Sequence, residues 1–163
     1  HGVLGPDGRF GRGTTPLAGR LADRLTTVEG EPALMVTDAL YFPASDVEEI
    51  LKVKAAFNLA MSALLREAGI GPSKLAAIHL AGALGEHVGL DDLETLGFLP
   101  PGFGARTVRA GNTSLQGTEL LLADPDARTY AEGLSRSLTV LELAGDPRFG
   151  DGFVKRMQFN YVD

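Results

Sequence analysis

Residues 75–81 (LAAIHLA) constrain the fold more than any other stretch, because they are apolar almost throughout and run into Gly82 and Gly85. Strands that are apolar at consecutive positions are typical of parallel sheets covered on both faces. A long helical pattern precedes this strand, and a second candidate strand follows at residues 105–110. The alternation of strand and helix predicts an α/β fold.

The helical pattern covers residues 46–68, with Ser45 as the expected N-cap and Gly69 as the C-terminal stop. Its apolar residues recur at i, i+3 and i+4 and mark one buried face. Lys54 falls near the middle of that face, with Asn58 one turn later. Burying an unpaired ammonium is costly. Either the stem of Lys54 packs while its charge reaches water or an acidic partner, or the face opens into a cleft where Lys54 meets a polar or anionic ligand.

The rest of the chain divides at residue 45. Residues 1–45 are expected to form an irregular segment, with short strands at 34–37 and 39–42, that continues from a missing upstream part. Residues 46–163 are expected to form one subdomain. Its further elements are a short helix from Asp91 to near Gly97, a helix over 114–123, a helix from Pro125 to about Arg136, and a strand over 137–143 (SLTVLEL).

Composition narrows the classes of function. The 163 residues include 15 Lys and Arg against 21 Asp and Glu, so the net charge of −6 argues against nucleic acid and anionic membranes as partners. The absence of cysteine excludes disulfides and thiol chemistry in this chain. His1, His79 and His87 are too scattered for a metal site, and His79 reads as a packed core or interface residue. We predict neither a catalytic residue nor a metal ligand.

Two strand ends run into glycine. Gly111 and Asn112 follow the strand at 105–110, just as a glycine pair follows the strand at 75–81. Ordinary turns and a helix cap would explain each loop separately. Because the two strands are expected to be neighbours, the loops together predict a shallow, backbone-lined trough that suits a flat ring. The candidate ligand-binding residues are Gly82, Ala83, Leu84, Gly85, Gly111, Asn112 and Lys54.

Four segments in this order carry a resemblance to a known family. They are DVEEILKVKAAFNLAMSALLREAGI, IHLAGALGEHVGLDDLETLGFLP, VRAGNTSLQGTELLL and VLELAGDPRFGDGFVKRMQF. Between Asp46 and Phe159 the chain resembles the C-terminal end of the reductive activators of corrinoid proteins. The resemblance implies an RNase H-like half-domain of the acetate and sugar kinase, heat-shock chaperone and actin (ASKHA) superfamily, with a mixed sheet and flanking helices.

The same resemblance implies a function. Family members use ATP with Mg²⁺ to drive the reduction of cob(II)alamin to cob(I)alamin on a corrinoid methyl-transferring partner, and they carry a [2Fe–2S] domain at the N-terminus. This chain would then be a C-terminal fragment that contributes the adenosine side of the ATP site and is inactive in isolation. A cytoplasmic homodimer without nucleic acid or membrane partners is expected.

Two alternatives remain open from the sequence. The chain is a non-catalytic module for dimerisation or for docking onto the corrinoid protein, or it is part of a small-molecule kinase of the same superfamily. Nucleotide at Gly82–Gly85 would separate the first alternative from ATP binding, and the upstream sequence would decide the second.

Overall fold

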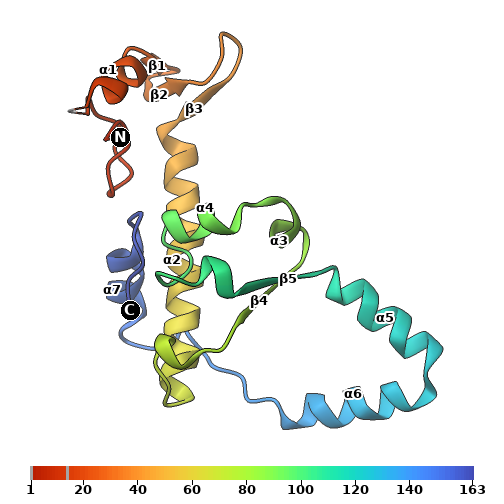
Figure 1. The fold of residues 1–163 in the computed structure, drawn as a ribbon. Helices are drawn as coiled ribbons and strands as arrows, with labels where there is room; N and C mark the ends of the chain where they lie inside the picture. Colours follow the sequence, from red (N-terminus) through yellow and green to blue (C-terminus); the bar gives the residue numbers. More distant parts are fainter. Residues whose placement is uncertain (1, 14) are drawn as a thin grey trace.

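The computed structural model describes residues 2–13 and 15–163 (Figure 1). Its helices are α1 (Pro16–Ala22), α2 (Ala44–Glu67), α3 (Ala83–His87), α4 (Leu90–Thr95), α5 (Thr113–Ala123), α6 (Pro125–Ser137) and α7 (Phe149–Arg156), with short 3-10 turns at Pro72–Lys74 and Gly104–Arg106. Its strands are β1 (Leu25–Val28), β2 (Glu31–Met35), β3 (Tyr41–Pro43), β4 (Ile78–Ala81) and β5 (Thr107–Gly111). Across the described residues, every helix is too short or too polar to cross a membrane.

The strands form two separate sheets. β1, β2 and β3 form an antiparallel sheet in sequence order, next to the start of α2 (Figure 1). β4 and β5 form a parallel pair, with His79 opposite Val108. The fold is therefore α/β, as the sequence predicted, with antiparallel and parallel pairing kept apart in two sheets.

Helix α2 is the long central element. It starts at Ala44, with Pro43 as an N-cap residue that makes no side-chain cap, so the expectation that Ser45 caps the helix was wrong. Ser45 lies inside the first turn, where its hydroxyl donates a 3.0 Å hydrogen bond to Glu31 and ties α2 to β2. The C-terminal end agrees with the sequence, since Gly69 adopts a φ of 65° just after the helix.

One cluster of the hydrophobic core lies between α2, α4 and one face of the β4–β5 sheet. Its buried members are Leu93, Phe98, Leu99 and Phe103. Ile78 and Leu80 of β4 pack against this cluster. On the alternate positions His79 and Val108 are exposed, so the expectation of a packed His79 does not hold within this chain. One face of a parallel sheet is thus left uncovered.

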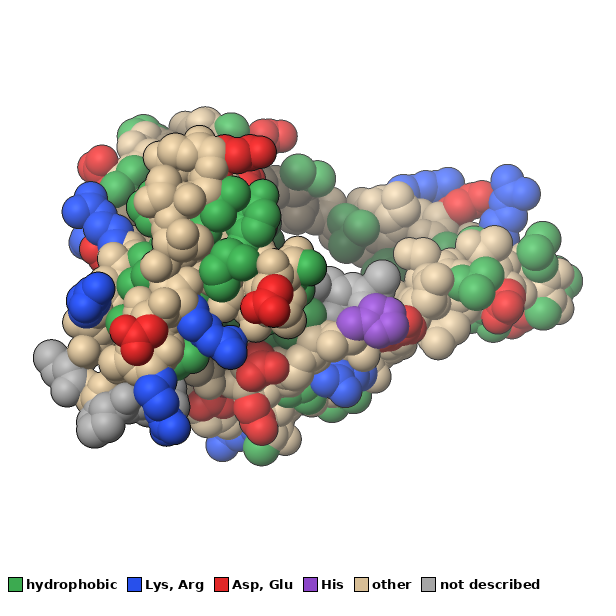
Figure 2. All heavy atoms as spheres, turned by 90° about the horizontal axis from the view of Figure 1, so that it is seen from above, with side chains coloured by type: hydrophobic (Ala, Val, Ile, Leu, Met, Phe, Trp, Pro, Cys, Tyr) green, Lys and Arg blue, Asp and Glu red, His purple; other side chains and the backbone are tan. Residues whose placement is uncertain are grey.

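Helices α5 and α6 form a hairpin that projects from the body, called here the arm (residues 113–137) (Figures 1 and 2). Both helices lie close to where the sequence predicted them, with α6 starting at Pro125 as expected and α5 starting one residue early, at Thr113; Asn112 and Asp124 are their N-caps. The strand expected over 137–143 was wrong, because Ser137 ends α6, residues 138–143 are irregular, and no strand among the described residues pairs with them. Helix α1 and strand β1 were not anticipated in a segment rich in glycine.

Candidate functional site

The two glycine loops meet at one edge of the parallel sheet. The Gly82 amide donates a 2.9 Å hydrogen bond to the carbonyl oxygen of Gly111, immediately beyond the paired residues of β4. This confirms that the two predicted strands are adjacent and parallel, with both glycines at the same edge. The strands are shorter than expected at their N-terminal ends, since β4 begins at Ile78 and β5 at Thr107.

Gly82 and Gly111 leave open space over their backbones. Gly82 has a φ of 89°, and among the atoms that the structure describes outside its chain neighbours, none lies within 4 Å of where a Cβ would be. Gly111 has a φ of 68°, and a Cβ on it would approach only the ends of two described side chains, at 3.6 Å and 3.8 Å. Both conformations favour glycine. The open space is what close approach of a flat ligand to the backbone requires.

Gly85 has a different reason to be glycine. It is buried in α3, and a Cβ there would lie 3.0 Å from both Cγ and the carbonyl oxygen of Leu80. Close packing of α3 on β4 therefore accounts for Gly85 without a ligand. Ala83 and Leu84 form the first turn of α3, and their side chains lie outside the described part of the structure.

Asn112 is the cap of α5. Its Oδ1 accepts a 3.0 Å hydrogen bond from the Leu115 amide, while the residue as a whole is exposed. The cap satisfies one of the free N–H groups in the first turn of α5. Asn112 thus lies beside the glycine edge, as expected, with its side-chain oxygen already occupied.

Lys54 is not brought to this edge. Its side chain is fully buried, and its ammonium donates to the carbonyl oxygens of Arg156, at 3.2 Å, and of Asn160. Burial lowers the pKa of Lys54 to about 8, and the positive charge of Arg156 acts in the same direction. In Figure 1 α7, which carries Arg156, lies on the other side of α2 from β4 and β5. Lys54 therefore anchors the C-terminal segment.

Two side chains near the edge were missed by sequence reasoning. They are Gln116, whose Nε2 comes within 3.6 Å of a Cβ built on Gly111, and Glu86, whose Oε1 comes within 3.8 Å. Glu86 follows Gly85 directly, and Gln116 lies one helical turn after Asn112. Their closeness in sequence to the candidate ligand-binding residues could have indicated that both side chains lie near the edge. They add one amide and one carboxyl group to a backbone-lined surface.

The edge offers binding groups and little reactive chemistry. Within residues 2–13 and 15–163, no group of three His, Asp or Glu side chains is placed to hold a metal ion. Backbone polar groups, an amide and a carboxyl group can orient a flat polar molecule by hydrogen bonds. Bond making or breaking would need groups from outside this edge.

The described part of the chain is thus an α/β module whose two parallel strands both end on open glycine loops, and open α/β sheets bind their ligands at this end of the strands. Residues 3–163 match the family model described as the C-terminal domain of RACo, the ASKHA domain. The chain belongs to this family.

Two relatives agree with this assignment. The chain is 29% identical over 114 residues to the corrinoid activation enzyme RamQ of Eubacterium limosum, an alignment that covers 70% of this chain and 19% of RamQ. A solved structure named reductive activator for corrinoid,iron-sulfur protein has the same fold, with a TM-score of 0.83 and 21% identity. That match covers 99% of this chain and 26% of the solved one. The chain thus matches 19% of the length of RamQ and 26% of the length of the solved relative.

Proposed function

We propose that this chain is the C-terminal part of an ATP-dependent reductive activator of corrinoid proteins and supplies the adenosine-facing wall of its ATP site. The observation that carries the proposal is the edge formed by Gly82 and Gly111, where two loops joined by a hydrogen bond leave their backbones open. Family membership supports ATP as the ligand, and the names of the two relatives support a corrinoid protein as the partner.

The proposed wall consists of Gly82 to Gly85 on one side, and of Gly111 and Asn112 on the other. Adenine or ribose would lie over the open backbone of Gly82, with Glu86 and Gln116 within reach of its polar groups. Hydrolysis of bound ATP supplies free energy for reduction of the corrinoid, and a [2Fe–2S] domain elsewhere in the longer protein is the proposed electron source. The residues of this chain bind and orient the nucleoside only.

Lys54 is left out of the proposed wall. Its two hydrogen bonds to main-chain carbonyl oxygens hold the ammonium within the C-terminal segment. Moving it toward the glycine edge would leave those carbonyl groups without a donor. We therefore assign Lys54 a structural role and keep the nucleoside on the glycine loops.

Hydrogen exchange on the full-length protein, with and without ATP and Mg²⁺, tests this proposal. Protection is expected in residues 82–86 and 111–116, and no change in the antiparallel hairpin of β1 and β2, which serves as the internal control. ATP binding without protection at the glycine edge would contradict it. Loss of ATP-dependent cob(II)alamin reduction after mutation of the edge, followed by absorbance of the corrinoid, would link binding to activity.

A further inference from the structure

Two polar side chains flank the open backbone of Gly111 from different elements. Glu86 of α3 brings its Oε1 to 3.8 Å from the Cβ position of Gly111, and Gln116 of α5 brings its Nε2 to 3.6 Å. Both residues are exposed. The side-chain hydrogen bonds that Asn112 and Arg109 make beside the edge involve neither of them. Two polar groups are therefore available to a ligand that lies on the glycine edge.

The two polar ends differ in what they can bind. A carboxylate only accepts hydrogen bonds, and its two oxygens match a pair of neighbouring donors, whereas an amide presents a donor and an acceptor side by side. In adenosine, the 2′- and 3′-hydroxyl groups of ribose are the pair of neighbouring donors. The N6 amine and N7 of adenine are the donor and the acceptor, and a glutamine amide pairs with both. Ribose therefore suits Glu86, and adenine suits Gln116.

The charge of Glu86 also bears on how a nucleotide lies. The phosphates of ATP are anionic, and a carboxylate at close range repels them. Arg109, the basic residue of β5, is hydrogen-bonded to the carbonyl oxygen of Val88 at 2.7 Å rather than to Glu86. The repulsion opposes an orientation with the phosphates at α3, and it favours one in which the ribose hydroxyl groups face Glu86.

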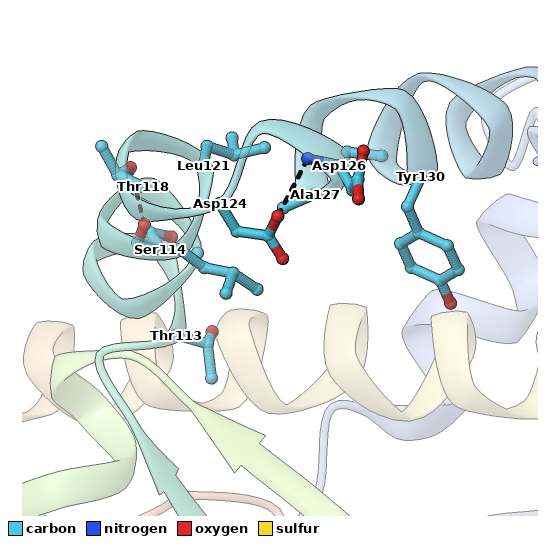
Figure 3. A pocket seen from close by; sticks show the side chains of 11 residues that line it. Thr113, Ser114, Thr118, Leu121, Asp124, Asp126, Ala127 and Tyr130 are labelled. Carbon is cyan, nitrogen blue, oxygen red and sulfur yellow. Dashed lines mark hydrogen bonds between the residues drawn. The ribbon is translucent and has the colours of Figure 1, made fainter.

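The cavity of the arm is a separate space. It has a volume of about 550 Å³ and lies between α5 and α6, with Thr113, Leu121 and Tyr130 among the side chains that line it (Figure 3). Gln116 does not line this cavity, and its amide lies near Gly111 instead. A nucleoside held by Gln116 would therefore lie on the glycine edge and outside the cavity of the arm.

We infer that Glu86 and Gln116 determine the specificity and the orientation of the bound nucleoside. Glu86 accepts hydrogen bonds from the ribose hydroxyl groups, and the amide of Gln116 pairs with N6 and N7 of adenine. This inference rests on the proposed function, because it places both contacts on the adenosine-facing wall. It adds what open glycines cannot supply, since space over a backbone does not distinguish ribose from deoxyribose or adenine from guanine.

Nucleotide affinities of the full-length protein, measured by titration calorimetry, test the ribose contact. The wild type should bind ATP about 10-fold more tightly than 2′-deoxyATP, because the analogue lacks one hydrogen bond to a charged acceptor. Glu86→Gln should lower this ratio to about 3, because a hydrogen bond to a neutral acceptor is about half as strong.

Glu67→Gln is the matched control for charge. Glu67 is exposed at the C-terminal end of α2, outside the glycine edge, and its substitution removes the same charge. It should leave the ratio of the two affinities at the wild-type value. A general effect of charge on the anionic nucleotides changes both affinities equally and cancels in the ratio. A wild type without the preference, or an unchanged ratio in Glu86→Gln, would overturn the inference.

Gln116→Leu tests the base contact. Guanine presents two acceptors, O6 and N7, where adenine presents a donor and an acceptor, so the wild type should prefer ATP over GTP. Gln116→Leu should lower this preference by about 5-fold or more and leave the ratio of ATP to 2′-deoxyATP affinity unchanged. If Gln116→Leu altered the ribose ratio and Glu86→Gln altered the base preference, the nucleoside would lie the other way round, and the inference would be overturned.

Hydrogen exchange with ATP separates failure of this inference from failure of the proposed function. Protection of residues 82–86 and 111–116, with unchanged specificity in both variants, would overturn the inference and leave the adenosine-facing wall in place. ATP binding without protection there would overturn both. Protection confined to residues 125–131 would place the nucleotide in the cavity of the arm and would likewise overturn both.

Discussion

The amide of Gly82 donates a 2.9 Å hydrogen bond to the carbonyl oxygen of Gly111. This bond joins the two glycine loops directly, whereas the sequence predicts only that the two strands before them are neighbours. Neither loop can shift without the other, since the bond continues the pairing of β4 and β5. A surface built from two loops gains rigidity in this way. The glycines of this surface have different roles: Gly82 leaves open space for a ligand, whereas Gly85 allows α3 to pack on β4. Substitutions at the two positions can distinguish these roles.

Gly82→Val tests ligand approach. A valine side chain fills the open space over the backbone, so we expect the affinity of the full-length protein for ATP to fall by about 10-fold or more. Gly30→Val is the matched control, because Gly30 has the same φ of 89° and the same open surroundings in the turn between β1 and β2. Titration calorimetry measures the affinity, and circular dichroism the folding. Equal loss in both variants would assign the effect to backbone strain.

Gly85→Ala tests packing. The new methyl group would lie 3.0 Å from Leu80, so we expect the variant to lose about 1–3 kcal/mol of unfolding free energy. Gly133→Ala, inside α6 with no atom within 4 Å, should instead gain about 0.5–1 kcal/mol. Urea denaturation of the 163-residue chain measures both. If the Gly85→Ala variant had the unfolding free energy of the wild type, α3 could shift away from β4 at little cost, which would contradict close packing as the reason for Gly85.

Asn112→Ala tests the cap of α5. Loss of the bond from Asn112 Oδ1 to the Leu115 amide should destabilise the helix by about 1 kcal/mol and speed amide exchange in its first turn. Asn112→Asp keeps a capping oxygen and should exchange like the wild type. If ATP binding falls in the Asp variant as well, Asn112 has a role at the nucleotide beyond capping.

Lys54→Met tests the buried ammonium. Lys54 has a pKa of about 8 in the folded protein against 10.5 as its ordinary value. Between these values the unfolded state binds the proton more strongly, so the stability of the wild type rises with pH there. The variant lacks this rise. The unfolding free energy of each protein is measured by denaturation below pH 8 and between pH 8 and 10.5. The difference in unfolding free energy, wild type minus variant, should be larger in the higher pH range. A constant difference would contradict the lowered pKa.

Local sequence signals predicted the elements around the site well. Gly69 and Pro125 each act within one turn of the chain, and each marks a helix end where it was expected. The glycine edge was predictable for a similar reason, because each of the two strands runs directly into a glycine in the sequence, at Gly82 and at Gly111. These features depend on few distant contacts.

Distant contacts explain what the sequence did not reveal. The hydrogen-bond partners of Lys54 lie 102 and 106 residues further along the chain, so no local pattern announces them. Residues 137–143 have the composition of a strand, but a strand needs a neighbour, and within the described residues none lies beside them. Tertiary context decided both cases.

Main-chain groups hold the segment that follows α7. Lys54 binds the carbonyl groups of Arg156 and Asn160, the amide of Phe159 donates to Pro6 at 2.7 Å, and a Cβ on Gly97 would overlap the main chain of Asn160. Main-chain groups are the same in every residue except proline. The fit of residues 157–160 therefore depends on the number of residues in this segment, and deleting one of them would move the Asn160 carbonyl away from the buried Lys54 ammonium.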